Sequence, residues 1–365
     1  MRKLGFGLMR LPHIDGKPDL EQFTKMTDRF LSEGFNYFDT STVYGDSETM
    51  LRLCLTSRYP RERYILTNKL TENLFQSESD LPGVFQKQLE TCGVDCFDYY
   101  LLHALNAGYY KKFSKCNTFQ FIQALKTEGK VKHIGISFHD RAAVLEQILS
   151  EHPEIEVVQI QFNYADYLSP SIESKACYEV CRKHQKPVIV MEPVRGGALV
   201  KLPDEAKAVF DALHGGSYAS YAIRYAASFE GVMTVLSGMS TIGQMEDNLS
   251  YMKDFHPLTE AEFTAVGKVV GILKNQKMIA CTACRYCVPG CPQNIDIPAL
   301  LNCLNNKKLH QDWLSNVYYG VHTEKGGKAS DCINCGKCEK ICPQRLPVQS
   351  YLKEAAKVFE TKPEQ

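Results

Sequence analysis

Short apolar segments alternate along this chain with longer stretches in which apolar residues recur at helical spacing. Eight of the short segments have the length and composition of buried strands, at residues 4–11, 35–40, 64–70, 97–103, 131–137, 156–162, 187–193 and 231–238. Strands that alternate with helices are parallel, because each must return by a crossover connection. Eight such units predict an α/β fold, a closed (β/α)8 TIM barrel rather than an open doubly wound sheet, and no G-x-G-x-x-G motif follows the first strand.

The intervening stretches predict helices. The segment "DLEQFTKMTDRFLSEG" (19–34) has helical spacing, with Asp19 as a cap and Gly34 at its end. Further helices are predicted at 118–129, 141–152 and 171–184, and a closing helix at 257–278. The composition then shifts toward cysteine. We therefore predict two domains, a barrel over residues 1–275 and a smaller domain over residues 276–365.

The overall composition narrows the possible partners. Lys plus Arg and Asp plus Glu each total 42, so the formal net charge is zero. A balanced charge gives no electrostatic reason to expect nucleic acid or an anionic membrane as a partner, and no apolar run has the length of a membrane span. We expect a cytoplasmic protein, in which the 15 cysteines are thiols or metal ligands rather than disulfides.

Four polar residues lie at or just after the ends of predicted strands. Asp39, Lys69 and His103 end the second, third and fourth strands, and Tyr44 follows Asp39 by five residues. The carboxyl ends of barrel strands meet at one mouth, so these side chains should converge. A neighbouring lysine lowers the pKa of a tyrosine, and a carboxylate would keep that lysine charged. Tyr44 could then protonate a carbonyl oxygen while hydride reaches the carbon, with His103 orienting the oxygen or relaying the proton.

At these residues the sequence resembles the aldo-keto reductase superfamily. The matching segments, in order, are "NYFDTSTVYG" (36–45), "TNKL" (67–70), "LLHALN" (101–106), "IGIS" (134–137), "VVQIQFNY" (157–164) and "MEDNL" (245–249). The resemblance covers about residues 4–255. It implies a barrel, a nicotinamide dinucleotide bound across the carboxyl face, a small carbonyl substrate, and a catalytic tetrad of Asp39, Tyr44, Lys69 and His103.

The resemblance also implies cofactor contacts. Ser137 and Gln159 match the pair that holds the nicotinamide carboxamide, and Met191 stands where an aromatic residue often stacks on the ring. Gly238 and Gln244 stand about where basic residues commonly clamp a 2′-phosphate, which favours NAD over NADP and leaves room for a flavin. The full set of expected contacts is Ser137, Gln159, Met191, Arg195, Gly196, Gly197, Ser237, Gly238, Ser240, Gln244, Asp247 and Asn248.

Two copies of one cysteine pattern, C-x2-C-x2-C-x3-C-P, follow the predicted barrel. This is the spacing of bacterial-type ferredoxins with two [4Fe–4S] clusters, in which the fourth ligand of each cluster comes from the other run. One cluster should use Cys281, Cys284, Cys287 and Cys342, and the other Cys332, Cys335, Cys338 and Cys291. Structural zinc usually takes two C-x2-C pairs and does not need this longer pattern. The order of barrel and cysteine module resembles the ferredoxin-containing branch of the aldo-keto reductases.

About 40 residues separate the two runs, and they contain Trp313, Tyr318 and Tyr319. These aromatic residues either pack the small domain onto the barrel or shield the barrel mouth and shape the substrate pocket. His139, just after the fifth predicted strand, is a further candidate site residue.

Three functions are compatible with the sequence. The first is hydride transfer between NAD(P)(H) and a carbonyl compound or alcohol. The second is electron transfer, in which the clusters exchange single electrons with a redox partner protein and a flavin converts them to two-electron chemistry. In the third, the clusters are purely structural and staple a small domain that lacks a large core.

Overall fold

The computed structural model describes residues 2–169, 172–275, 279, 281, 283, 285–311, 313–342 and 344–361. Its main feature is a closed barrel of parallel strands in the order β1-β10-β9-β8-β7-β6-β5-β4. Each strand pairs with its neighbours in parallel register, for example Phe6 with Phe38 and Ser137 with Gln159. The predicted (β/α)8 fold is therefore confirmed, and the strand ends share one mouth.

All eight predicted strands are present within the predicted segments or one to two residues beyond them. The first is shorter than predicted, because the chain turns into a 3-10 helix at Leu8–Arg10. The barrel strands are β1 (Leu4–Gly7), β4 (Tyr37–Asp39), β5 (Ile65–Leu70), β6 (Phe97–Leu105), β7 (Val131–Phe138), β8 (Val157–Gln161), β9 (Val188–Met191) and β10 (Val232–Ser237). A short hairpin of β2 (His13–Ile14) and β3 (Lys17–Pro18) follows the first strand.

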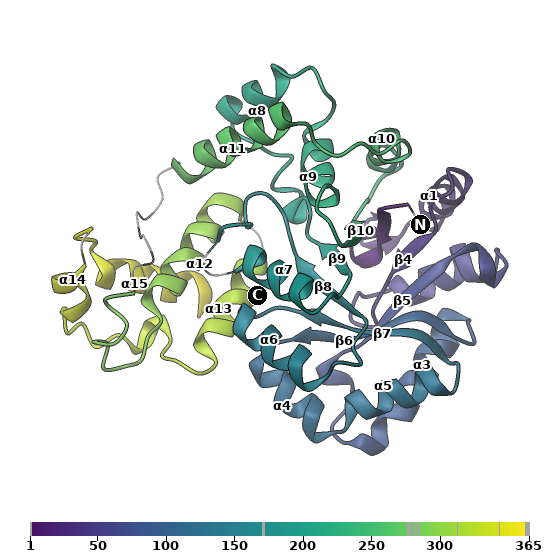
Figure 1. Ribbon diagram of the computed structural model, residues 1–365, viewed down its shortest axis with the longest axis horizontal. Coiled ribbons are helices and arrows are strands. Elements are labelled where there is room, and N and C mark those ends of the chain that lie inside the picture. The colour runs from purple at the N-terminus through teal and green to yellow at the C-terminus, as the bar shows by residue number, and fades with distance from the viewer. Residues whose placement is uncertain are drawn as a thin grey trace.

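Helices surround the barrel strands (Figure 1). They are α1 (Leu20–Ser32), α2 (Ser47–Leu51), α3 (Leu81–Cys92), α4 (Ala107–Lys115), α5 (Thr118–Thr127), α6 (Ala142–Glu151), α7 (Ser174–Lys183), α8 (Asp204–Asp211), α9 (Tyr218–Ala227), α10 (Ile242–Met252) and α11 (Glu260–Asn275). The predicted Asp19 cap is present, since its carboxylate accepts a 3.0 Å hydrogen bond from the Gln22 amide. Among the helices that the structure describes, none is both long and apolar enough to cross a membrane.

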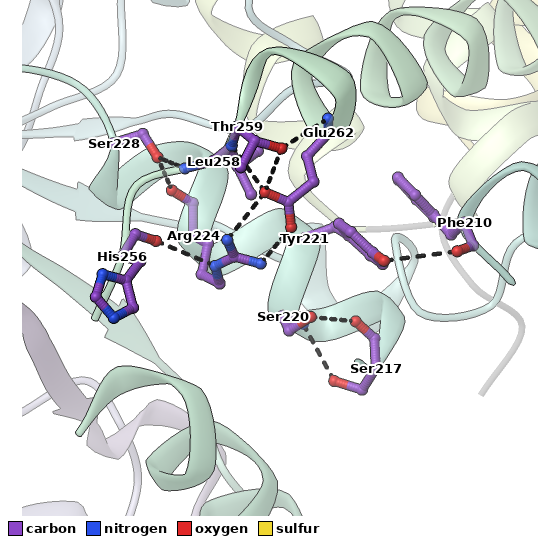
Figure 2. A network of polar contacts seen from close by, with 10 residues as sticks. All are labelled: Phe210, Ser217, Ser220, Tyr221, Arg224, Ser228, His256, Leu258, Thr259 and Glu262. Carbon is purple, nitrogen blue, oxygen red and sulfur yellow. Dashed lines mark hydrogen bonds and ion pairs between the residues drawn. The ribbon is translucent and has the colours of Figure 1, made fainter. Parts of the chain in front are cut away.

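The closing helix α11 is fixed to the barrel by an ion pair with α9 (Figure 2). Arg224 binds both carboxylate oxygens of Glu262, at 2.6 and 3.0 Å. The same carboxylate accepts hydrogen bonds from the amide and hydroxyl of Thr259, whose hydroxyl in turn accepts from the Glu262 amide. This reciprocal capping starts α11 and joins it to α9 with one side chain.

The residues after α11 form a second lobe that contains α12 (Ile297–His310), α13 (Leu314–Thr323), α14 (Lys337–Ile341) and α15 (Val348–Phe359). It has a hydrophobic core of its own, separate from the barrel core. The Tyr319 ring stacks on Phe359 at 4.5 Å, and its hydroxyl accepts a hydrogen bond from the Ala329 amide. In Figure 1, α13 lies on the side of the lobe next to the barrel and α14 on the far side.

A charged bridge joins the two lobes. Arg141, just after β7, donates to the carboxylate of Asp296 at the start of α12, and its Nη2 atom lies 3.1 Å from Nδ1 of His322 on α13. Arg285, inside the first cysteine run, pairs with the same carboxylate at 3.2 Å. Burial acts to raise the pKa of Asp296, but the two arginines outweigh it and hold that pKa below its ordinary value. The side chain therefore stays ionised and holds both arginines at neutral pH.

Candidate active site and cluster sites

A cavity of about 770 Å³ lies at the mouth of the barrel. Its walls come from Gln159 on β8, from the ends of the other seven barrel strands and the loops after them, and from α13 of the second lobe. Three of the four predicted catalytic residues, Asp39, Tyr44 and His103, line it directly. Lys69 is fully buried beneath it.

The predicted tetrad converges. Lys69 Nζ donates to Asp39 Oδ1 at 2.5 Å and to the carbonyl of Thr40 at 2.8 Å. The same nitrogen lies 4.8 Å from the centre of the Tyr44 ring. The Tyr44 and His103 rings meet edge to face, with centroids 5.8 Å apart. A tyrosine hydroxyl, an ammonium and an imidazole are therefore gathered at one point of the cavity.

The electrostatics of the tetrad differ in one respect from the sequence-based expectation. Burial raises the pKa of Tyr44, and although Lys69 acts to lower it, the net direction is upward. Burial, together with Lys69 and His139, holds the pKa of His103 well below its ordinary value. Tyr44 is therefore a protonated phenol and His103 a neutral imidazole at neutral pH. The His103 Nδ1 atom lies 2.7 Å from the Thr71 hydroxyl, which fixes the ring.

The buried ion pair supplies charge to the site. Burial acts to lower the pKa of Lys69, but Asp39 and Tyr44 outweigh it, so the lysine stays charged. Gln159 donates to the second Asp39 oxygen at 3.3 Å. The Asp39 carboxylate is thus held from two sides in a site that excludes water.

The expected nicotinamide contacts are only partly available. Ser137, Gln159, Met191 and Gly238 line the cavity, and the Ser137 hydroxyl is buried without a hydrogen-bond partner among the described residues. Such an orphaned hydroxyl fits a ligand amide that would complete its bonding. Met191 lines the cavity and offers an apolar thioether side chain at the position where the family often has an aromatic ring.

The glycine loop differs from the prediction at Arg195. Its side chain is buried and donates to Asp166 at 2.9 Å, so it braces the loop from behind instead of lining the cavity. Arg195 adopts a left-handed backbone conformation, as do Gly196 and Gly197. Gly196 faces the cavity-lining side chains of Arg10 and Glu192.

Five other expected cofactor contacts, on β10, on α10 and between them, hydrogen-bond to neighbouring residues. Asn248 donates to Ser237 at 2.6 Å and accepts from Tyr251, while Asp247 accepts from Ser217 at 2.7 Å. The Ser240 amide donates to Gln244, and the Ser240 hydroxyl donates to the Arg10 carbonyl. None of these five expected contacts, Ser237, Ser240, Gln244, Asp247 and Asn248, is among the residues that line the cavity.

Two groups of cavity residues were missed by sequence reasoning. Arg10 lies in the 3-10 turn after β1, a segment predicted as strand, and it pairs with Glu192 across the mouth. Of the cavity residues on α13 and at its two ends, Trp313 was among the sequence-based candidates, whereas Leu314, Asn316, Val317, Gly320, Val321 and Glu324 were missed. Their spacing is helical, and this periodicity in "WLSNVYYGVHTE" was the available signal.

His139 is also placed in the cavity wall. It is buried, and its ring packs against Tyr318 of α13 with centroids 6.4 Å apart. Burial lowers the pKa of His139 to about 4, so it is neutral at physiological pH. Its Nδ1 atom has no partner among the described residues and faces the junction between the lobes.

The cysteines of the second lobe line two further cavities. Cys291, Cys332, Cys335 and Cys338 line one, and Cys281, Cys287 and Cys342 line the other. Cys284 lies outside the described residues. Each cavity thus takes its last cysteine from the opposite run, as predicted for the fourth ligand. The described His, Cys, Asp and Glu side chains include no group of three placed as ligands of a single metal ion.

The fold and the strand-end constellation are those of a barrel oxidoreductase joined to a cysteine-rich module. The family model for the aldo/keto reductase family matches residues 3–270, and the model for a 4Fe-4S dicluster domain matches residues 280–347. The chain belongs to the aldo/keto reductase family, an oxidoreductase family, and carries a C-terminal 4Fe-4S dicluster domain. The predicted branch of the family is thereby confirmed.

Individual relatives are distant. The chain is 26% identical to a glyoxal reductase of Bacillus subtilis, over 56% of this chain and 69% of the relative. It is 25% identical to an L-galactose dehydrogenase of Arabidopsis thaliana, over 70% of this chain and 85% of the relative. A structure of aldo-keto reductase AKR11C1 from Bacillus halodurans superposes with a TM-score of 0.60 at 24% identity, over 73% of this chain and 91% of that one. A structure of an aldo-keto reductase from Klebsiella pneumoniae in complex with NADPH superposes with a TM-score of 0.61 at 18% sequence identity, over 73% of this chain and 90% of that one.

Proposed function

We propose that the protein transfers hydride between NAD(P)(H) and a small aldehyde, ketone or alcohol at the barrel mouth. The observation that carries this proposal is the packing of Tyr44 against the buried Lys69–Asp39 pair at the base of a cavity. Relatives named as a glyoxal reductase and an L-galactose dehydrogenase support carbonyl and alcohol chemistry.

Tyr44 is the group that moves the proton. Because burial keeps its phenol protonated, Tyr44 can donate to a carbonyl oxygen as negative charge develops there. Lys69 favours the resulting phenolate through its charge, and Asp39 holds that lysine in place. In the direction of alcohol oxidation the same phenolate accepts the proton.

His103 orients the substrate oxygen. Its neutral imidazole is anchored through Nδ1 to Thr71, which leaves the other ring nitrogen to hydrogen-bond the same carbonyl oxygen as Tyr44. Two neutral donors aimed at one oxygen stabilise the charge that forms on it.

A nicotinamide, when bound, supplies or accepts the hydride. Ser137 and Gln159 would hold its carboxamide, and Met191 would contact the ring. The buried, unpartnered hydroxyl of Ser137 fits this assignment. A structure of a relative in complex with NADPH agrees with a nicotinamide cofactor.

The two cysteine cavities support an assignment of the cluster ligands. Cys281, Cys284, Cys287 and Cys342 would hold one [4Fe–4S] cluster, and Cys332, Cys335, Cys338 and Cys291 the other. Apolar side chains around these cysteines, including Ile297 between both cavities, would keep water away.

A second candidate role is electron transfer to a redox partner protein. Ile297 lines both cysteine cavities and directly follows Asp296, the residue that binds Arg141 of the barrel. Arg141 in turn lies two residues after His139, which lines the barrel cavity. This short connection favours communication between the sites. A flavin bound in the purified protein would support this role, since a flavin exchanges both one and two electrons.

The test is anaerobic purification followed by NADH- and NADPH-dependent reduction of an aldehyde series. Replacing Tyr44 with Phe should reduce turnover about 100- to 10,000-fold, the usual contribution of a general acid. The control is Tyr178→Phe on the outer face, where the hydroxyl donates only to the Glu230 carbonyl. Equal activity in the two variants would contradict the proposal, as would the absence of any nicotinamide oxidation by the wild-type protein.

A further inference from the structure

The outer wall of the catalytic cavity comes from the cluster-bearing lobe. Helix α13 presents Leu314, Val317 and Val321 to the cavity, together with Trp313 at its N-cap. The neighbouring positions Tyr318 and Tyr319 turn away, toward the barrel rim and α15. One helix therefore carries a cavity face, a barrel contact and a core contact.

Part of the apolar face of α13 is not covered by packing, although Leu314 belongs to the core of the second lobe. Trp313, the only tryptophan of the chain, is 45% exposed, and Val317 is half-buried. Val43, Tyr109 and Met9 add exposed apolar surface to the same cavity. An apolar surface held open within a catalytic cavity is the usual form of a small-molecule site.

Gly320 lies in the middle of this face. It is a cavity-lining residue inside a helix, and a Cβ placed there would meet nothing within 4 Å. Glycine weakens a helix interior, so its presence is not explained by helix stability. Its missing side chain instead leaves room in the cavity between Val317 and Val321.

The charges around the cavity add a second constraint. The acidic side chains lining it are Asp39, Glu72, Glu192 and Glu324, and the basic one is Arg10, which is already paired with Glu192. Glu324 closes the end of the α13 face, where its carboxylate lies over Gly108 of α4. A ligand carboxylate near α13 would face this negative charge, whereas a neutral group would not.

We infer that α13 is the substrate-selecting wall of the site: it takes the apolar substituent of a neutral carbonyl compound, with Gly320 setting the size that fits. The inference rests on the proposed hydride-transfer function and deepens it. It makes the cluster-bearing lobe a part of the substrate pocket, whatever electrons the clusters carry.

The bridge between the lobes positions this wall. Arg141 of the barrel reaches His322 on α13 and Asp296 at the N-cap of α12, and Asp296 also holds Arg285 inside the first cysteine run. Loss of the Arg141 contacts would loosen the attachment of α13 to the barrel, where the packing of Tyr318 on His139 remains, and would leave the Arg285–Asp296 pair intact. Arg141 is therefore a positioning residue for the pocket.

The first experiment changes the size of the pocket with Gly320→Leu. Its matched control is Gly271→Leu on α11, an exposed helical glycine with the same open surroundings, outside the cavity. Leucine is a better helix former than glycine, so weaker binding cannot come from a weaker helix. The ligands are 4-methylbenzyl alcohol and its close analogue 4-carboxybenzyl alcohol, titrated into the cluster-loaded protein by calorimetry and by Trp313 emission.

The wild-type protein should bind the methyl compound at least about tenfold more tightly than the carboxylate. Gly320→Leu should weaken binding of the methyl compound about tenfold or more, and Gly271→Leu should not. Equal affinities in the two variants, or no binding to the wild type, would overturn the inference. Because binding is read without turnover, this result is separate from failure of the hydride-transfer proposal, which the Tyr44 variant tests.

The second experiment uses Arg141→Met, with Arg182→Met as its control, since Arg182 forms an ion pair with Glu230 on the surface. Arg141→Met should shift Trp313 emission and weaken binding of the methyl compound, with cluster absorbance unchanged. If Arg141→Met behaves like Arg182→Met in both readouts, Arg141 does not position α13.

Discussion

Arg10 donates a 2.9 Å hydrogen bond to Glu192 across the mouth of the barrel, and both side chains line the catalytic cavity. The second Glu192 oxygen is buried and has no partner among the described residues. Gly196 and Gly238, two of the glycines expected to border a dinucleotide, both lie against Arg10. A phosphate in this position would compete with Glu192 for the guanidinium.

Arg10→Met should therefore weaken NADP(H) binding by about one to two orders of magnitude, because hydrogen bonds to charged groups contribute about 1.5–3 kcal/mol. Fluorescence titration of the reduced cofactor measures this directly. Glu192→Gln removes the carboxylate that competes with the phosphate for Arg10, so this variant should bind NADP(H) as tightly as the wild type or more tightly. Unchanged affinity in Arg10→Met would show that Arg10 does not contact the cofactor.

The reduction reaction should be insensitive to pH across the neutral range. Burial raises the pKa of Tyr44 above its ordinary value of 10.0 and holds that of His103 well below 6.5. The active pair is a protonated phenol and a neutral imidazole, so its protonation is constant between these limits. A kcat/KM profile for aldehyde reduction should be flat from about pH 7 to 9 and fall only at higher pH, as Tyr44 deprotonates. A midpoint near pH 7 would contradict this assignment.

Exchange of the fourth ligand between the cysteine runs predicts paired effects. Cys291→Ser should disturb the cluster held by Cys332, Cys335 and Cys338, and leave the one served by Cys342 intact. EPR spin quantitation after dithionite reduction should fall from about two clusters per chain to about one in each single variant. The double variant Cys291→Ser/Cys332→Ser should lose no more cluster signal than Cys291→Ser alone, because both residues serve the same cluster. The double variant Cys291→Ser/Cys342→Ser should lose signal from both clusters. Loss of both clusters in the pair Cys291→Ser and Cys332→Ser would contradict the exchange.

The α9–α11 ion pair predicts a pH-dependent contribution to stability. Burial acts to raise the pKa of Glu262, but hydrogen bonds from Arg224 and Thr259 outweigh it and leave the pKa below its ordinary value of 4.5. A carboxylate with a lowered folded-state pKa stabilises the fold above that ordinary value and loses its contribution as the pH falls through the folded-state pKa. Glu262→Gln should lower the free energy of unfolding at pH 7 by about 1–3 kcal/mol. In urea melts, this difference from the wild type should shrink below about pH 4, and a difference that stays constant would argue against the ion pair.

The barrel could be predicted from the sequence because the local hydrophobic periodicity of the chain indicates each barrel strand and the helices between them. The convergence of Asp39, Lys69 and His103 followed from topology, since parallel strands end at one mouth. The direction of the Tyr44 pKa could not be predicted, because it depends on how far burial outweighs the charge of Lys69. Arg195 was assigned to the cavity from its glycine neighbours, but its partner Asp166 lies 29 residues away in sequence and draws the side chain behind the loop.

The α13 wall shows a different limit. Trp313 was recognised as a residue that either packs the lobes together or shapes the pocket, and periodicity alone could not decide between the two. The decision depends on where the second lobe docks, which is set by long-range contacts such as Arg141 with His322 and His139 with Tyr318. Such contacts between distant segments leave no local pattern in the sequence.

The most direct test of the account is a single-turnover reaction of the cluster-loaded protein with NADPH deuterated at C4 and 4-methylbenzaldehyde, analysed by mass spectrometry of the alcohol. Hydride transfer within the barrel predicts that one face of the cofactor delivers one deuterium to the alcohol carbon. This deuterated alcohol should no longer form in Tyr44→Phe, and it should still form in Tyr178→Phe. Alcohol formed without deuterium from either face, or with the same yield in Tyr44→Phe, would contradict hydride transfer at this site.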